Sequence, residues 1–143
     1  MTSLTALLDC KNRCLRRFLQ SSLDYSGELE AGEFSGLQKF LLKRERIIKA
    51  LDLYDRKISS VIEKMNPSAR DELLLEEIRT RIVTKNDIVT RIMKLDAKIM
   101  DKIEGEMKSL VGELSGAKKT KGNISKFKST WVAKSGEELD KTL

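Results

Sequence analysis

The sequence contains no histidine, a single proline (Pro67) and only 5% aromatic residues. Without histidine, the usual general base near pH 7 is missing. A β-rich protein would need many aromatic and β-branched residues and frequent turn residues, so this composition argues against one. Charged residues make up 35% of the chain, which is typical of long solvated helices rich in Leu, Ile, Lys, Arg and Glu. The composition therefore predicts an all-α protein.

The chain has only two cysteines, Cys10 and Cys14, whose spacing of four places them on one face of a helix. Two thiolates without histidine make a poor zinc site, and this spacing is not a CxxC redox motif. We interpret both as small apolar side chains near a core, so we expect no metal and no cofactor. Reduced thiols, the absence of a signal-peptide pattern in Met1–Leu8 and the absence of a long apolar run predict a cytoplasmic protein.

Apolar residues recur at helical spacing in three long segments, which we predict to be helices. These are Thr2–Leu23, a segment from Phe34 or Leu37 to Met65, and Ser68–Leu114. Asp24–Gly36 is acidic and contains three glycines, so it is predicted to be a loop. Pro67 ends the second helix, and Asn66 or Ser68 can cap the third. The prediction is an antiparallel bundle of three long helices over residues 1–115, followed by a basic C-terminal tail over residues 116–143.

The apolar seams of these helices predict the core. Arg44 and Asp55 stand at seam positions of the second helix where apolar residues are expected, which favours a bundle with irregular seams over a strict coiled coil. The side chains expected to be buried are Ile48, Leu51, Ile58, Ile78, Ile82 and Ile99.

The third helix would extend about 70 Å at 1.5 Å per residue, longer than the second helix can cover. Its far end should therefore project or pair with another chain. Met93, Met100 and Met107 lie seven apart and form one stripe beside the seam. Either they pack in an ordinary core, or they line a groove for a partner helix, where flexible methionine is common. The candidate partner-binding residues are Met93, Met100, Ile103, Met107, Leu110 and Leu114.

The tail carries six lysines and no acid between Ala117 and Lys134. We expect it to be mobile in the free protein. Its apolar residues Ile124, Phe127 and Trp131 are candidate regulatory residues, because they could dock on the apolar strip of the third helix and compete with a partner. The first helix or a second copy in a homodimer could cover the same strip instead.

Two other functions compete with protein binding as interpretations of the sequence. Lysines of the tail could meet phosphates, giving a nucleic-acid or anionic-surface binder, but Phe127 and Trp131 alone form a thin stacking platform. All-helical chorismate mutases bind a dicarboxylate between helices with cationic and acidic side chains. The cations available here also suit solvent-exposed faces, which makes the enzymatic signal weak: Arg13, Arg44, Arg46, Arg56 and Lys57.

Residues 30–51 resemble one family. A short acidic turn leads into a helix with leucines, then a Lys-Arg-Glu run, then paired apolar residues, as in flagellar type III export chaperones of the FliT/FlgN type. The apolar-periodic run from Ile92 to Leu114 before a Gly- and Lys-rich tail is also similar. The positions that carry the first likeness are Leu37, Leu41, Leu42, Arg44, Glu45, Ile47, Ile48 and Leu51.

The resemblance, which covers roughly residues 4–115, implies a cytosolic helical bundle that keeps late flagellar subunits soluble and delivers them to the export machinery. Such chaperones bind terminal helices of these subunits through a hydrophobic groove, which a C-terminal segment can cover. The lysine-rich tail with Trp131 departs from the family pattern. We therefore expect a chaperone or adaptor for flagellar or other secreted subunits, and not an enzyme.

Overall fold

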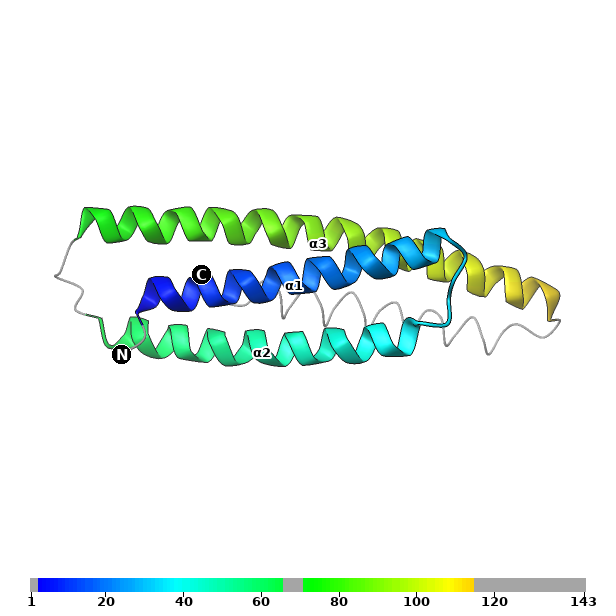
Figure 1. Cartoon of the computed structure of the whole chain (residues 1–143), viewed down its shortest axis with the longest axis horizontal. Coiled ribbons are helices and arrows are strands. Elements are labelled where there is room, and N and C mark those ends of the chain that lie inside the picture. Colours follow the sequence, from blue (N-terminus) through cyan, green and yellow to red (C-terminus); the bar gives the residue numbers. More distant parts are fainter. Residues whose placement is uncertain (1–2, 66–70, 115–143) are drawn as a thin grey trace.

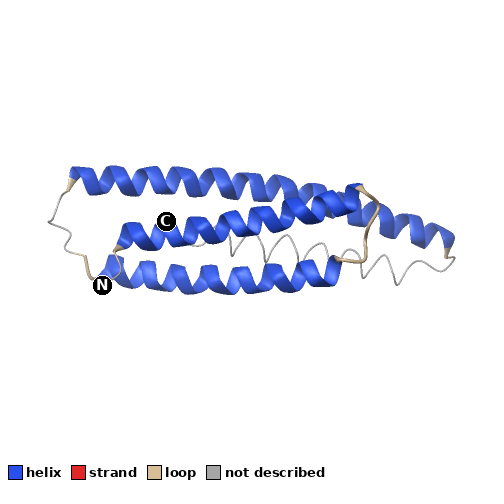
Figure 2. Ribbon diagram, in the orientation of Figure 1, coloured by secondary structure: helices blue, strands red, loops and turns tan. Residues whose placement is uncertain are grey.

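The computed structural model describes residues 3–65 and 71–114. This part of the chain consists of three long α-helices and contains no strand (Figures 1 and 2). The helices are α1 (Leu4–Glu30), α2 (Leu37–Glu63) and α3 (Glu72–Glu113). The predicted all-α fold is confirmed. The tail over residues 116–143, with Ile124, Phe127 and Trp131, lies outside the described residues.

Helix α1 occupies the middle of the bundle. Successive helices run in opposite directions, so that α2 is antiparallel to α1 and α3 is parallel to it (Figure 1). Both neighbours pack along α1, whereas no Cα atom of α2 lies within 8 Å of a Cα atom of α3. Because α1 has a neighbour on each side, its buried residues spread over a broad arc instead of a single narrow stripe.

The loop predicted over Asp24–Gly36 is wrong in its first half, because α1 continues to Glu30. Tyr25 and Leu29 extend the helical spacing of the core residues before them, and both are buried against Phe40 of α2. Their burial outweighs the weak helix propensity of the neighbouring glycine and acidic residues. The chain reverses at Gly32, whose φ of 80° lies in the left-handed region that glycine adopts without strain.

Helix α3 begins at Glu72, four residues later than predicted. Asp71 is its N-cap, and the Asp71 carboxylate accepts hydrogen bonds from the backbone N–H groups of Leu73 and Leu74. Asp71 therefore takes the capping role that the sequence pattern assigned to Asn66 or Ser68, both of which lie outside the described residues.

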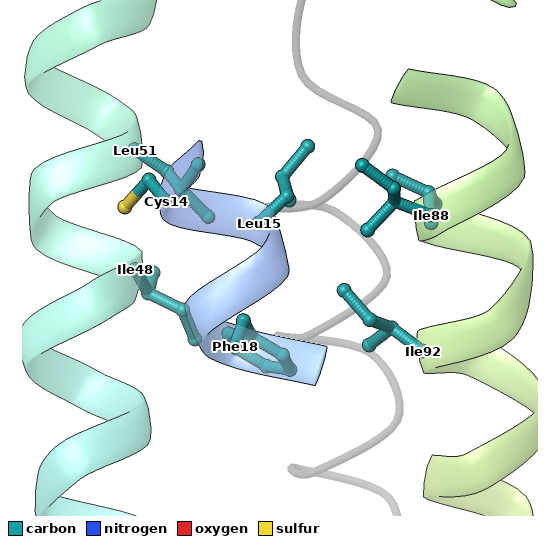
Figure 3. Close-up of a cluster of buried hydrophobic side chains, with 8 residues drawn as sticks. Cys14, Leu15, Phe18, Ile48, Leu51, Ile88 and Ile92 are labelled. Atoms are coloured by element: carbon teal, nitrogen blue, oxygen red, sulfur yellow. The ribbon is translucent and has the colours of Figure 1, made fainter. Parts of the chain in front are cut away.

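The core comprises three apolar clusters along α1. The middle cluster joins Leu15 and Phe18 of α1 to residues of both neighbours, including Leu51 and Ile92 (Figure 3). The second lies near the α1–α2 connection, and the third lies near the start of α1. Four of the six residues expected in the core are buried, namely Ile48, Leu51, Ile58 and Ile99.

Ile78 and Ile82 are only half-buried, so this part of the core prediction is wrong. The amide of Asn12 donates a hydrogen bond to the Arg81 carbonyl at 3.1 Å, which fixes how α1 and α3 align. The first turns of α3 therefore lie beside the first turns of α1. Ile78 packs at the edge of the third cluster instead of inside it.

Candidate partner-binding surface

The structure divides the six predicted partner-binding residues into two groups. Met100 and Ile103 are buried in the cluster that contains Tyr25, Leu29 and Phe40. These two side chains belong to the core and present no surface to a partner. The other four side chains are exposed on α3: Met93, Met107, Leu110 and Leu114.

The last turns of α3 extend past the connection between α1 and α2 (Figure 1). Lys98 marks the level at which α1 ends, because the Lys98 Nζ atom lies 2.8 Å from the Glu30 carboxylate. The hydrogen bond from Lys98 lowers the pKa of the Glu30 carboxyl. The segment 104–114 continues for about 16 Å beyond the buried Ile103. An ion pair of 3.3 Å between Lys108 and Glu104 supports this part of the helix.

Three exposed apolar side chains share one face of this projecting segment, which we call the distal α3 face. Met107 is 39% exposed, Leu110 is 46% exposed and Leu114 is 69% exposed. Their spacings of three and four place them on one side of the helix. Met93 lies two heptads before Met107, about 21 Å away along the axis, and does not belong to this face. The distal α3 face has the spacing of anchor residues by which helices dock against one another.

A second feature of the molecule is a row of charged side chains in the interior. Arg44 of α2 donates two hydrogen bonds to the Asp96 carboxylate of α3, at 2.8 and 2.7 Å. The Arg44 guanidinium also lies 4.4 Å above the centre of the Phe18 ring. The Lys11 Nζ atom of α1 lies 2.7 Å from the Asp55 carboxylate of α2. Each charged residue that interrupts the α2 seam is thus paired with an opposite charge on another helix.

We call Lys11, Arg44, Asp55, Lys85 and Asp96 the interior charged row, since all five are buried. Lys85 lies on the same face of α3 as Asp96, three turns earlier. Sequence reasoning missed Lys11, Lys85 and Asp96, because a charged residue on an amphipathic helix is usually solvated. The available signal was the pair of charged seam positions, because a buried charge needs an opposite charge nearby.

The five cations considered for dicarboxylate binding do not form one site. Arg44 is buried and paired with Asp96, whereas the other four side chains are exposed. Two of these have neighbours on their own helix: Arg13 donates to the Cys10 sulfur, and Arg56 pairs with Asp52. Within residues 3–65 and 71–114, no group of three or more Cys, Asp or Glu side chains is arranged to hold a metal ion.

The two cysteines differ in environment. Cys14 is buried, its thiol lies 3.8 Å from the Ile47 carbonyl, and burial raises its pKa, an effect that the nearby Arg17 partly offsets. Cys10 is partly exposed and lies 3.1 Å from an Arg13 nitrogen. Both are free thiols, and the expectation that a cysteine contributes to the core is confirmed for Cys14.

This difference predicts selective alkylation. At pH 8, a thiol reagent should modify Cys10 quickly in the folded protein and Cys14 only when the bundle opens, since attack requires an accessible thiolate. Mass spectrometry of tryptic peptides after timed quenching measures both rates, and the urea-unfolded protein serves as the control in which the two rates converge. Equal rates in the folded protein would contradict the prediction.

None of the three helices is both long enough and apolar enough to cross a membrane. Comparison of the chain with protein-family models, with curated proteins and with solved structures finds no match.

Proposed function

We propose that the protein is a chaperone or adaptor that binds a helical segment of another protein on the distal α3 face. The observation that carries this proposal is the exposure of Met107, Leu110 and Leu114 on one side of a projecting helix end. Covering apolar surface is favourable by about 25 cal/mol per Å². Within the described part of the chain, residues 104–114 form only the convex side of one helix, whereas a small ligand would need a concave pocket. An amphipathic helix with its own apolar stripe matches this surface.

We further propose that the partners are late flagellar export subunits. What supports this narrower proposal is the likeness of residues 37–51 to flagellar export chaperones, together with the antiparallel helical bundle. Within that segment, Arg44, Ile48 and Leu51 are buried. These three matching residues therefore stabilise the fold, whereas Leu42 is 50% exposed. We assign partner recognition to α3, which carries the distal α3 face.

The test is the substitution Leu110→Asp in the full chain. A carboxylate at the centre of the distal α3 face should weaken binding of a terminal helix from a late flagellar subunit by about 30-fold, which corresponds to roughly 2 kcal/mol at an interface hot spot. The thermal melting temperature should change little, because Leu110 contributes nothing to the core clusters. Isothermal titration calorimetry with synthetic terminal segments of the host's flagellar subunits measures the affinity.

The matched control is Leu73→Asp, at the opposite end of the same helix, where the leucine is 79% exposed. It adds the same charge to α3 and should leave binding unchanged. Titrations at low and moderate salt separate this proposal from nucleic-acid or anionic-surface binding, which would collapse as salt rises. Equal loss in both variants, or no binding by any flagellar segment, would contradict the proposal.

A further inference from the structure

Helix α2 carries a stripe of exposed cations and leucines on the side opposite its buried residues. The stripe residues recur every three or four positions, so they follow one line along the helix. Leu42 is 50% exposed and Leu53 is 52% exposed. We call this line the outer α2 stripe, and all six of its residues are exposed: Lys39, Leu42, Arg46, Lys49, Leu53 and Lys57.

The outer α2 stripe has four cations and no carboxylate of its own. Lys49 forms an ion pair of 3.7 Å with Glu45, which lies on the flank of the stripe. Lys39, Arg46 and Lys57 form no ion pair with any residue of the described ranges 3–65 and 71–114. Unlike the interior charged row, these cations face solvent, so an external anion can reach them.

Helix α1 adds positive charge beside the stripe. Arg13 and Arg17 are exposed and stand one turn apart on the outer face of α1. Burial raises the pKa of Cys14 and the charge of Arg17 partly offsets this effect, so Arg17 lies near that thiol. The same thiol lies 3.8 Å from the Ile47 carbonyl of α2, next to Arg46. The cations of the two helices therefore flank their line of contact.

The acidic residues on this side of the molecule stand at one end. Asp24 and Glu28 lie on the exposed face of α1, toward its connection with α2. Lys39 stands near the same end, because it is the third residue of α2. The part of the stripe from Arg46 to Lys57, together with the arginines of α1, keeps an excess of positive charge.

We propose that the outer α2 stripe and the adjoining arginines of α1 bind an anionic lipid surface. Cations close to such a surface are attracted by its negative potential. The two leucines stand among these cations, where they can enter the boundary between headgroups and acyl chains while the helix lies flat on the bilayer. The stripe from Lys39 to Lys57 extends about 27 Å along the helix, so several headgroups can contact it at once.

Nucleic acid is the other polyanion that such cations could attract. Phosphates would meet the lysines and arginines equally well, but a phosphate backbone offers no apolar partner for Leu42 and Leu53. The stripe also has no aromatic side chain on which a base could stack. The lipid surface is therefore the better match. This inference goes beyond the proposed function, because it concerns a different helix and needs no helical partner.

The experiment measures co-sedimentation of the full chain with sucrose-loaded vesicles of equal parts phosphatidylglycerol and phosphatidylcholine. The natural chain should bind these vesicles and should not bind vesicles of pure phosphatidylcholine. Arg46→Gln/Lys57→Gln should weaken binding by about 30-fold, because each basic residue near an anionic surface contributes about five-fold in affinity. Circular dichroism confirms that the variant keeps its helices, as expected for two exposed positions.

A second variant tests the leucines, and a third is the matched control. Leu42→Ser/Leu53→Ser keeps every charge and should weaken binding about ten-fold, because it removes the apolar area that enters the bilayer. Arg91→Gln/Lys94→Gln removes the same charge from exposed positions of α3, on the other side of α1. It should weaken binding less than about three-fold, because these side chains lie farther from the lipid than the ~10 Å Debye length.

No binding to the mixed vesicles would overturn the proposal, as would an equal loss in the stripe variants and in the α3 control. Binding that both stripe variants leave unchanged would place the contact elsewhere in the chain and would also overturn it. The last arm measures fluorescence anisotropy of labelled oligonucleotides at the same salt concentration. Oligonucleotide binding that is tighter than vesicle binding, and that is lost in Arg46→Gln/Lys57→Gln but kept in Leu42→Ser/Leu53→Ser, would assign the stripe to nucleic acid instead.

Discussion

Asp96→Ala should destabilise the bundle by about 3–5 kcal/mol, the cost of leaving one member of a buried ion pair without its partner. The Arg44 guanidinium donates two hydrogen bonds to the Asp96 carboxylate, both shorter than 2.9 Å. Arg44 remains charged at any pH that the fold withstands. After the substitution it must either stay buried without this carboxylate or move out of the core. Urea titration followed by circular dichroism measures the change in the unfolding midpoint.

Two control variants separate the pair from the general effect of losing a carboxylate. Asp87 forms an exposed ion pair with Arg91 on the same helix, at 3.3 Å, and Asp87→Ala should cost less than about 1 kcal/mol. The double variant Arg44→Met/Asp96→Leu should recover much of the stability lost in Asp96→Ala, because buried ion pairs can often be replaced by apolar residues of similar volume. A loss as large in Asp87→Ala as in Asp96→Ala would contradict the assignment.

Hydrophobic periodicity was sufficient to predict three long helices, because apolar residues recur at helical spacing in each of them. It failed at Asp24–Glu30. There, exposed acidic residues and Gly27 stand next to the two buried positions, Tyr25 and Leu29, and interrupt the apolar pattern in the sequence. Those two residues are helical because they pack against Phe40, which is distant in sequence. Such tertiary support is invisible to a local pattern, which can show only propensity and spacing.

The charged seam residues show a similar limit. The pattern marked Arg44 and Asp55 as misplaced in an apolar seam, which is the correct signal. It could not identify Asp96 and Lys11 as their partners, which lie on other helices. From the sequence alone, Asp96 and Lys11 resemble the residues of a solvent-exposed helix face.

The candidate site was limited by where neighbouring helices end. Met93, Met100 and Met107 do share a stripe, as their spacing of seven requires. Met100 is buried because it packs with Phe40 and Leu29, whereas Met107 lies beyond them. Met93 is 47% exposed and lies at the edge of the buried face of α3. Periodicity assigns a residue to a face of its helix, but the lengths and alignment of the other helices decide whether that face is covered.

Phe18→Ala should also destabilise the protein by about 3–5 kcal/mol, the usual cost of truncating a buried aromatic residue. Phe18 is 1% exposed and lies in the middle cluster, between residues of α2 and α3 (Figure 3). The substitution should leave a cavity that the neighbouring side chains cannot fill, because α1 is held on both sides by packed helices. Chemical unfolding measures the loss, and Leu23→Ala, at a residue 48% exposed on the same helix, should cost less than about 0.5 kcal/mol.

Part of the cost should come from the Arg44 guanidinium, whose central carbon lies 4.4 Å from the centre of the Phe18 ring. Comparing Phe18→Ala in the natural chain and in the Arg44→Met/Asp96→Leu background isolates this contribution, because the background removes the cation without leaving Asp96 buried alone. A coupling of about 0.5–2 kcal/mol is expected for a cation over a desolvated ring. A coupling near zero would mean that Phe18 acts through apolar packing alone, and that the position of Arg44 is set by Asp96.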